Sequence, residues 1–408
     1  MRPAAASSSS VEQRARTPRT VAYYAAFVAL GMASASLGPT LPGLAQHTQS
    51  RLSDISSLFV ARSLGYLAGS LLGGRLYDRI PGHPVMAAGL LLMAGMMGLA
   101  PLVPMLWALA AAILILGLAE GALDVGGNAL LVWVHREQVG PFMNGLHFFF
   151  GLGAFLSPLI IAQTMLRGGD IVRAYWTLAL LLLPGAFWLL RLPSPAAPAV
   201  SSAGSAGQVN GRLVALLVVF FFLYAGAEVA LGGWIYSYAA ALHLSSDAVA
   251  AYLTSAFWGS LTVGRLLAIV FAARYPPQSI LLADFIGCLA SLGFLWLLPS
   301  SLVATWLGTC GVGLSMASIF PATLSLAQGR MRITGQVTGW FFVGASAGGM
   351  TLPWVVGQFF ESVGPRATIG ILLIDLSAAV GLLAVLTFRS ARPVYQWIVE
   401  RPAQPTRE

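Results

Sequence analysis

The stretch LVPMLWALAAAILILGLAEGALDVGGNALLVWV, residues 102–134, is long and apolar enough to cross a membrane, yet it contains two carboxylates. Glu120, Asp124 and Asn128 recur at a spacing of four, which places them on one stripe of a helix. A charged side chain at the centre of a bilayer costs about 3 kcal/mol or more, so such acids face partners, water or a transported ligand. The pattern therefore predicts a membrane helix with a polar stripe that serves transport.

Apolar runs of this kind recur along the whole chain. Of the 408 residues, 57% are hydrophobic and 9% are charged, and the mean hydropathy is +0.80, which together exclude an ordinary soluble domain. We predict an all-α membrane protein with twelve spanning helices of roughly 20 residues each, six in each half. Their approximate limits are 21–47, 55–75, 84–100, 102–134, 142–166, 174–192, 213–242, 248–273, 279–298, 302–328, 337–360 and 367–388.

A Pro-, Ala- and Ser-rich segment separates the two sets of six. Residues 193–211 carry no charge and show no periodicity, which predicts a flexible cytoplasmic linker. The six-helix halves are then 21–192 and 212–388, with tails at 1–20 and 389–408. Several residues of the first half recur 195 positions later, which predicts two pseudo-symmetric repeats facing each other across a cavity. These are Gly31, Gly38, Gly140, Gly153 and Pro158, matched by Gly226, Gly233, Gly335, Gly348 and Pro353.

The basic charge is carried by arginine alone, because the chain has no lysine. The arginines concentrate in the tails and in every second loop, so the positive-inside rule predicts that both termini are cytoplasmic. We interpret the chain as a monomer in a bacterial inner membrane, with no nucleic-acid partner. Cys288 and Cys310 lie in predicted spans without metal-ligand spacing, and the motifs of common enzyme families are absent. We therefore predict no enzyme, no metal and no cofactor beyond a coupling proton or sodium ion.

The loop GGRLYDRIPG, residues 73–82, resembles the pattern G-x-x-x-D-R-x-G-R of the loop between the second and third spans of the major facilitator superfamily. The resemblance implies the twelve-helix fold of that superfamily and a set of charges that latch one conformation. The second basic pair of the pattern is missing, since His83 stands there. Arg265 joins the predicted gating set because its Gly-Arg-Leu context repeats that of Arg75. The set comprises Gly74, Arg75, Asp78, Arg79 and Arg265.

Three further segments, 122–128, 144–154 and 224–234, resemble the fourth, fifth and seventh spans of the fucose/galactose/glucose symporter group, nearest its sodium-dependent glucose transporter-like branch. The resemblance implies that Asp124 is the acidic coupling residue and that Asn128 contacts sugar. His147 stands where the sugar symporters carry a glutamine. The second acid of the fucose symporter pattern is absent, because Gly38 occupies its position.

The candidate ion-coupling residues are Asp124, Glu228 and Glu120. A membrane-embedded carboxylate can take up a proton on one side and release it on the other, and Glu120 and Asp124 together could also hold sodium with Asn128. The competing interpretation is that these acids are satisfied by hydrogen bonds between helices. We expect Asp284 and Asp375 to be structural, because the ninth and twelfth helices of this fold are peripheral.

The candidate substrate ligands are amides, an imidazole and aromatic rings, which bind sugars through hydroxyl contacts and ring stacking. They are Asn128, Asn144, His147, Trp234, Trp340 and Gln358, and we also predict a broken helix at residues 232–234. The sequence thus favours a secondary transporter that carries a sugar or similar hydroxylated molecule by alternating access. Two alternatives stay open: a drug or metabolite/proton antiporter, and a membrane sugar sensor that does not transport.

Overall fold

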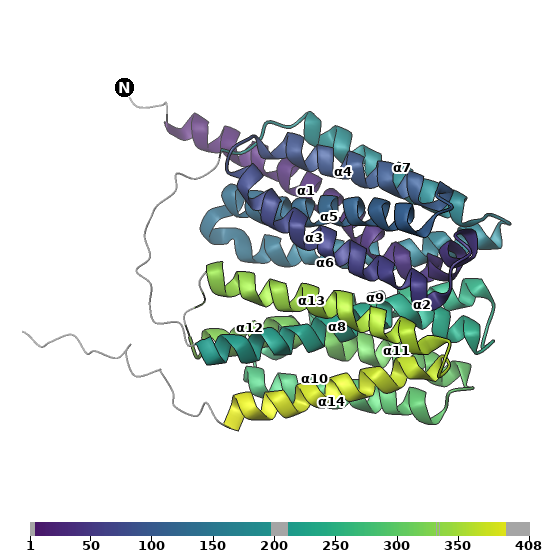
Figure 1. Ribbon diagram of the computed structural model, residues 1–408. Coiled ribbons are helices and arrows are strands. Elements are labelled where there is room, and N and C mark those ends of the chain that lie inside the picture. The colour runs from purple at the N-terminus through teal and green to yellow at the C-terminus, as the bar shows by residue number, and fades with distance from the viewer. Residues whose placement is uncertain (1–4, 197–210, 332, 334, 389–408) are drawn as a thin grey trace, which may run out of the picture.

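The computed structural model describes residues 5–196, 211–331, 333 and 335–388, and every regular element in these ranges is helical. The helices form two bundles, one above the other in Figure 1. The first bundle comprises α1 (Ala5–His47), α2 (Leu52–Ile55), α3 (Ser57–Tyr77), α4 (Gly82–Leu99), α5 (Leu106–His135), α6 (Val139–Leu166) and α7 (Ile171–Leu190). The second comprises α8 (Gly211–Ala241), α9 (Asp247–Ala272), α10 (Pro277–Leu297), α11 (Leu302–Met316), α12 (Ile319–Gln328), α13 (Gly335–Phe360) and α14 (Arg366–Phe388).

Each of the twelve predicted runs coincides with a helix, and two of them differ from the prediction in form. Helix α1 begins at Ala5, so the predicted N-terminal tail is helical from that residue onward. The tenth run is divided into α11 and α12. Most of the predicted linker and the whole C-terminal tail lie outside the described residues.

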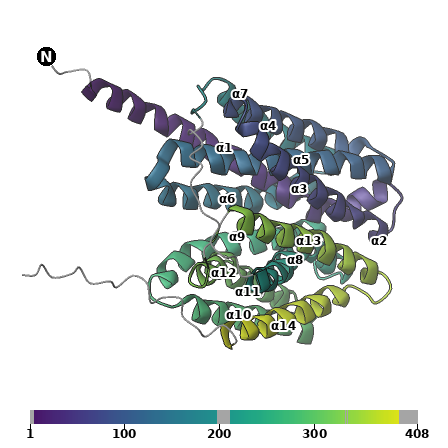
Figure 2. The ribbon, with the colours of Figure 1, turned by 60° about the vertical axis from the view of Figure 1, so that its left-hand side comes forward.

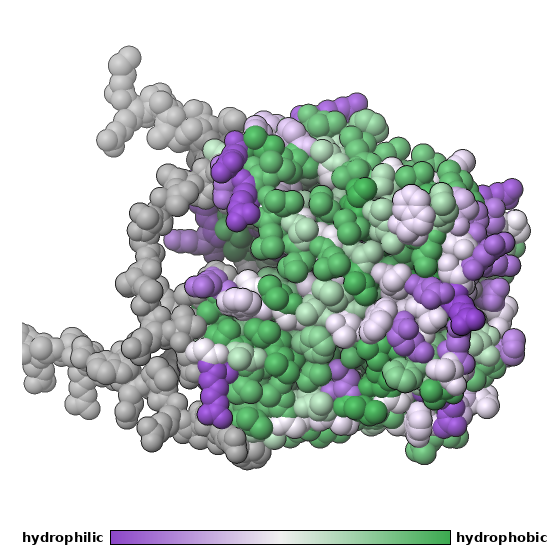
Figure 3. Space-filling model, in the orientation of Figure 1, coloured by the Kyte–Doolittle hydropathy of each residue, from purple (hydrophilic) through white to green (hydrophobic). Residues whose placement is uncertain are grey.

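The outside of the bundles is apolar around its middle. By length and composition, ten helical stretches among the described residues could cross a membrane, and one of these contains both α5 and α6. Large apolar side chains such as Trp107, Leu180 and Ile374 are more than half exposed. Figure 3 shows hydrophobic residues spread over the flank, with hydrophilic ones gathered towards its two ends. This distribution fits a lipid-facing belt between two aqueous faces.

Equivalent glycines mark equivalent helix crossings in the two bundles. A Cβ at Gly153 of α6 would lie 2.0 Å from the Val28 carbonyl oxygen of α1. A Cβ at Gly348 of α13 would lie 1.9 Å from the Phe222 carbonyl oxygen of α8. Both crossings need a residue without a side chain, because the helix backbones touch. The glycines that recur 195 positions apart therefore mark the same helix contact in both bundles, α1 with α6 and α8 with α13.

Candidate functional site

A cavity of about 1050 Å³ lies between the two bundles. Its wall includes Pro141 of α6, Tyr275 after α9 and Ser325 of α12, which lie towards the face where the described chain enters the linker. The cavity opens towards this face, which we call the linker face. Its polar and charged lining includes Ser34, Arg62, Tyr66, Glu120, Asp124, Asn144, His147, Glu228, Thr262, Arg265, Ser318 and Ser346.

The opposite face is closed by hydrogen bonds between the bundles. The Gln163 Nε2 of α6 donates to the Tyr252 hydroxyl of α9 at 2.6 Å. The Gln358 Nε2 of α13 donates to the Ser53 carbonyl oxygen of α2 at 2.9 Å. Helices α6 and α9, and helices α3 and α13, lie side by side along this boundary (Figures 1 and 2). The protein is thus open on one side and closed on the other.

Between the cavity and the closed face, α1 and α8 approach each other closely. A Cβ at Gly38 would lie 2.7 Å from the Gly232 carbonyl oxygen and 3.1 Å from the Gly233 Cα. An acidic side chain therefore does not fit at Gly38 in this conformation. The packing explains why the position that carries a carboxylate in the fucose symporter pattern is a glycine here.

A ladder of glycines sets the register of α3 against α5. Cβ atoms at Gly65 and Gly69 of α3 would lie 2.0 and 1.9 Å from the carbonyl oxygens of Leu114 and Leu118. Cβ atoms at Gly117 and Gly121 of α5 would each lie 2.1 Å from a carbonyl oxygen of α3. Glycines four residues apart let membrane helices meet backbone to backbone. This glycine spacing is visible in the sequence and indicates that α3 and α5 pack together. The stripe of Glu120 and Asp124 does not indicate which helix α5 packs against.

We expect Gly69→Ala to destabilise the first bundle by about 1–3 kcal/mol or more, because the new methyl group meets backbone that has no rotamer to yield. The measurement is the thermal unfolding midpoint of the purified protein in detergent. The matched control is Gly98→Ala in α4, since a Cβ there meets nothing within 4 Å. Equal midpoints for the two variants would contradict the role of the ladder.

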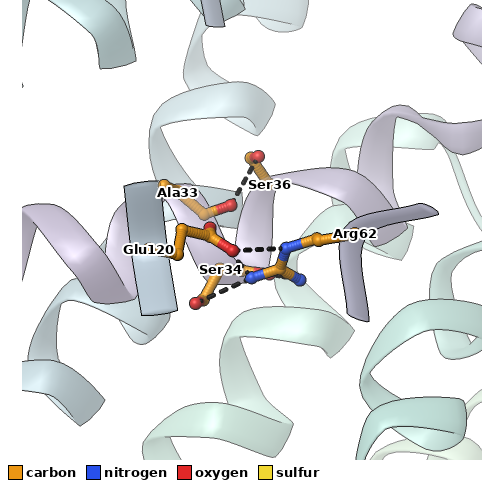
Figure 4. A network of polar contacts seen from close by, with 5 residues as sticks. All are labelled: Ala33, Ser34, Ser36, Arg62 and Glu120. Atoms are coloured by element: carbon orange, nitrogen blue, oxygen red, sulfur yellow. Dashed lines mark hydrogen bonds and ion pairs between the residues drawn. The ribbon is translucent and has the colours of Figure 1, made fainter. Parts of the chain in front are cut away.

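Arg62, which is partly exposed, and the buried Glu120 form an ion pair at the cavity wall (Figure 4). The Arg62 Nε donates to Glu120 Oε2 at 2.8 Å and its Nη2 donates to Oε1 at 3.0 Å. The remaining guanidinium donors reach Ser34 of α1, at its carbonyl oxygen and its hydroxyl. One side chain therefore ties α1, α3 and α5 together, and the Glu120 charge is fully compensated.

Removing one partner of this pair should be more harmful than removing both. Glu120→Gln leaves the Arg62 guanidinium in the wall without its counter-charge, and we expect a loss of about 1–3 kcal/mol in stability, because Arg62 is partly exposed to the cavity. The double variant Arg62→Gln/Glu120→Gln leaves no unpaired charge and should recover part of that loss. Thermal unfolding of both purified variants in detergent checks this. A double variant no more stable than Glu120→Gln would contradict it.

Asp124 lies one helical turn from Glu120 and has different partners. The Tyr66 hydroxyl donates to Asp124 Oδ2, and the Asn128 Nδ2 donates to Asp124 Oδ1 at 2.9 Å. Among the described residues, no arginine or histidine forms an ion pair with Asp124. Asn128 also donates to the Asp124 carbonyl oxygen and is not part of the cavity lining, so it orients the acid. Asp124 is therefore a cavity acid that is held in place without a compensating cation.

The second bundle contributes Glu228 of α8. The Tyr224 hydroxyl, one turn earlier, donates to Glu228 Oε2, and Arg265 of α9 also interacts with Tyr224. Asn144 and His147 of α6 line the same cavity, and His147 makes an edge contact with Phe27. The structure thus brings the predicted acids of both halves, one amide and one imidazole to a single space.

Besides Asn128, three more predicted substrate ligands do not line the cavity. Trp234 is fully buried, and its Nε1 donates to the Pro353 carbonyl oxygen at 2.9 Å. Trp340 is 52% exposed and lines a shallow second pocket with Gly211 and Val214. Gln358 lies on the closed face. We therefore remove these three from the candidate substrate site.

The helix break predicted at residues 232–234 is wrong, because α8 continues through them. Gly232 instead allows a close contact between helices, because a Cβ there would lie 2.9 Å from the Trp258 ring of α9. Trp258, which the sequence also offers as a cavity aromatic, lines the cavity. Arg62, expected to be an inward-facing packing or gating charge, pairs with Glu120. Tyr66 and Ser34 are lining residues that the sequence alone leaves unassigned, because their partners come from other helices.

The predicted gating residues at the end of α3 and just after it lie on the linker face. A Cβ at Gly74 would meet nothing within 4 Å, whereas one at Gly73 would lie 2.9 Å from the Ala122 Cα of α5. Asp78 and Arg79 are exposed, and within the described ranges neither forms an ion pair. An open latch on this side agrees with a cavity that opens to the same side. Arg265 lines the cavity itself.

Comparison with known proteins agrees with the fold. Residues 23–353 match the family model described as Major Facilitator Superfamily. The sodium-dependent glucose transporter 1 of Xenopus laevis is 34% identical over 356 residues, which are 80% of this chain and 72% of that protein. The sodium-dependent glucose transporter 1 of Homo sapiens is 31% identical over 373 residues, covering 82% and 72%.

Among solved structures, the nucleoside transporter NupG is similar with a TM-score of 0.73 at 14% identity, covering 91% of this chain and 98% of that one. At this identity the similarity shows the fold alone. The family match over most of the chain, the two bundles and the cavity between them lead to one conclusion. The chain belongs to the Major Facilitator Superfamily and is a membrane-embedded secondary transporter, not an enzyme.

Proposed function

We propose that this transporter carries a sugar or a similarly hydroxylated small molecule, coupled to a proton or sodium gradient. The observation that carries the proposal is Asp124, a carboxylate in the cavity wall that has hydrogen-bond donors but, among the described residues, no cationic partner. Such a group can bind a proton or a sodium ion when the cavity is open, and its charge then differs between the loaded and empty protein. Glu228 across the cavity is the second acid available for coupling.

The lining supports a hydroxylated substrate. Asn144 and His147 can hydrogen-bond hydroxyl groups, and Trp258 and Phe27 offer ring faces for the apolar side of a sugar. The volume of the cavity also suits a small ligand together with water. The relatives named as sodium-dependent glucose transporters point to the same class of substrate.

We further propose that the halves 21–192 and 212–388 rock against each other around this site, as a monomer. The arginine distribution supports an orientation with both termini in the cytoplasm of a bacterial cell. In that orientation the linker face is cytoplasmic, so the cavity opens inward.

The test is uptake of labelled hexoses into proteoliposomes, with an imposed proton gradient in one arm and a sodium gradient in the other. Accumulation above equilibrium in one arm would support a symporter and identify its ion. Liposomes without protein and liposomes with collapsed gradients are the controls. Binding of sugar with no uptake in either arm would indicate a sensor, and efflux of other compounds driven by protons would indicate an antiporter.

A further inference from the structure

The tenth membrane span is broken beside the cavity, and a proline explains the break. Helix α11 ends at Met316 and α12 begins at Ile319. Pro321 has no backbone N–H and cannot bond the Ala317 carbonyl four residues earlier, and its ring crowds that carbonyl. Ser318, Phe320 and Pro321 all line the cavity. The segment that can bend is therefore part of the cavity wall.

An acid from the neighbouring helix holds this break. The Ser318 hydroxyl donates to Asp284 Oδ2 of α10 at 2.7 Å. Asp284 lies one turn after Ile280, which lines the cavity. One turn further along, Gly287 contacts the Ser315 side chain of α11. This face of α10 is therefore turned to the broken span, and Asp284, expected to be structural, makes its hydrogen bond to the residue at the break.

We propose that Asp284 is a proton-responsive positioning residue that sets the bend between α11 and α12. The inference rests on the proposed transport function, because a change in the cavity mouth matters only if substrate passes through it. Its chemical basis is the hydrogen bond between Asp284 and Ser318. A serine hydroxyl has one proton to donate. While Asp284 is ionised, that proton goes to the carboxylate; once Asp284 is protonated, Ser318 can instead donate to a backbone carbonyl of its own span.

The consequence of this exchange reaches the mouth of the cavity. Helix α12 follows the break, and its Leu324 and Ser325 line the cavity on the side of the linker face. A change in the bend moves these residues relative to α11. Protonation of Asp284 would thus change how wide the cavity opens, without any contact between Asp284 and substrate.

Other ionisable groups around α10 do not compensate Asp284. The helices packed against α10 are α9, α11, α12 and α14, and α8 contacts it through the rings of Phe220 and Phe285. Within the described ranges, none of the ionisable groups of these helices pairs with Asp284, and α12 has none. The ionisable groups of α8 are Arg212, Tyr224, Glu228, Tyr236 and Tyr238. The others are Asp247, Tyr252 and Arg265 on α9, Cys310 on α11, and Arg366 and Asp375 on α14, while α10 itself adds Cys288.

The test reads the bend directly and needs no substrate. Ser325→Cys in a Cys288→Ala/Cys310→Ala background is labelled with bimane, and its fluorescence is followed from acidic to alkaline pH in detergent. We expect a single-site transition that is lost in Asp284→Asn and in Ser318→Ala. We expect Asp284→Glu to keep a transition with a shifted midpoint, and Asp375→Asn, the matched control, to leave it unchanged.

An unchanged transition in Asp284→Asn would overturn the proposal, as would a transition driven by sodium at constant pH. If Asp284→Asn does not elute as a folded monodisperse protein, the proposal is tested by Asp284→Glu and Ser318→Ala. An unshifted midpoint in the first, or an unchanged transition in the second, would overturn it. Because the readout is independent of sugar, failure of hexose uptake and failure of this inference give different results.

Discussion

Asp124→Asn is expected to abolish accumulation of substrate against its gradient while sparing exchange of substrate across the membrane. The asparagine can still accept from Tyr66 and lies beside Asn128, so the local geometry survives. It cannot bind a proton or neutralise a sodium ion, so movement of the ion is no longer tied to movement of substrate. The accumulation ratio in proteoliposomes should fall to unity.

Counterflow of labelled substrate against unlabelled substrate is the companion measurement, since it needs alternating access but no net ion movement. Glu137→Gln is the matched control, because Glu137 is an exposed acid after α5 and is remote from the cavity lining. Full accumulation by Asp124→Asn would remove Asp124 from the coupling role and leave Glu228 as the leading acid.

Cross-linking the closed face is expected to stop transport completely. Gln358 reaches across the bundles to the Ser53 carbonyl oxygen at 2.9 Å and to the Ser56 hydroxyl at 3.2 Å. Substrate cannot leave towards this face unless these contacts separate. A short bifunctional methanethiosulfonate on Ser53→Cys/Gln358→Cys, in a Cys288→Ala/Cys310→Ala background, should reduce uptake to the level of empty liposomes.

Reduction of the cross-link should restore uptake, which separates locking from damage. The matched control is Gly98→Cys/Trp176→Cys, because the Trp176 Nε1 donates to the Gly98 carbonyl oxygen within the first bundle. That cross-link should leave uptake unchanged. Transport by the cross-linked Ser53/Gln358 variant would mean that this face does not separate during the cycle.

The sequence predicted the helices well because each apolar run must satisfy its own backbone hydrogen bonds in lipid. The acids of the cavity were predictable for a related reason, since Glu120 and Asp124 share one stripe of α5. Partners from other helices were not predictable in this way. Whether Glu120 meets Arg62, and whether Trp234 faces Pro353 or a substrate, depends on how distant segments pack.

The broken helix shows where local reasoning chose the wrong signal. Two adjacent glycines at 232 and 233 allow a break, but they equally allow another helix to come close, and α1 does so. Pro321 in the tenth run removes a backbone donor, and the helix there is divided into α11 and α12. Helices α6, α7 and α13 continue through Pro158, Pro184 and Pro353, so a proline alone does not predict a break either.

The glycine ladder between α3 and α5 has a mechanical consequence. Where the backbones of α3 and α5 touch, neither helix can slide along the other by one turn. Such a slide would move Arg62 from Glu120 to Asp124. Helices α3 and α5 are therefore held in one register, with Arg62 opposite Glu120. If an ion binds at Asp124 as proposed, α3 and α5 cannot slide past each other in response, so we expect the two helices to move together.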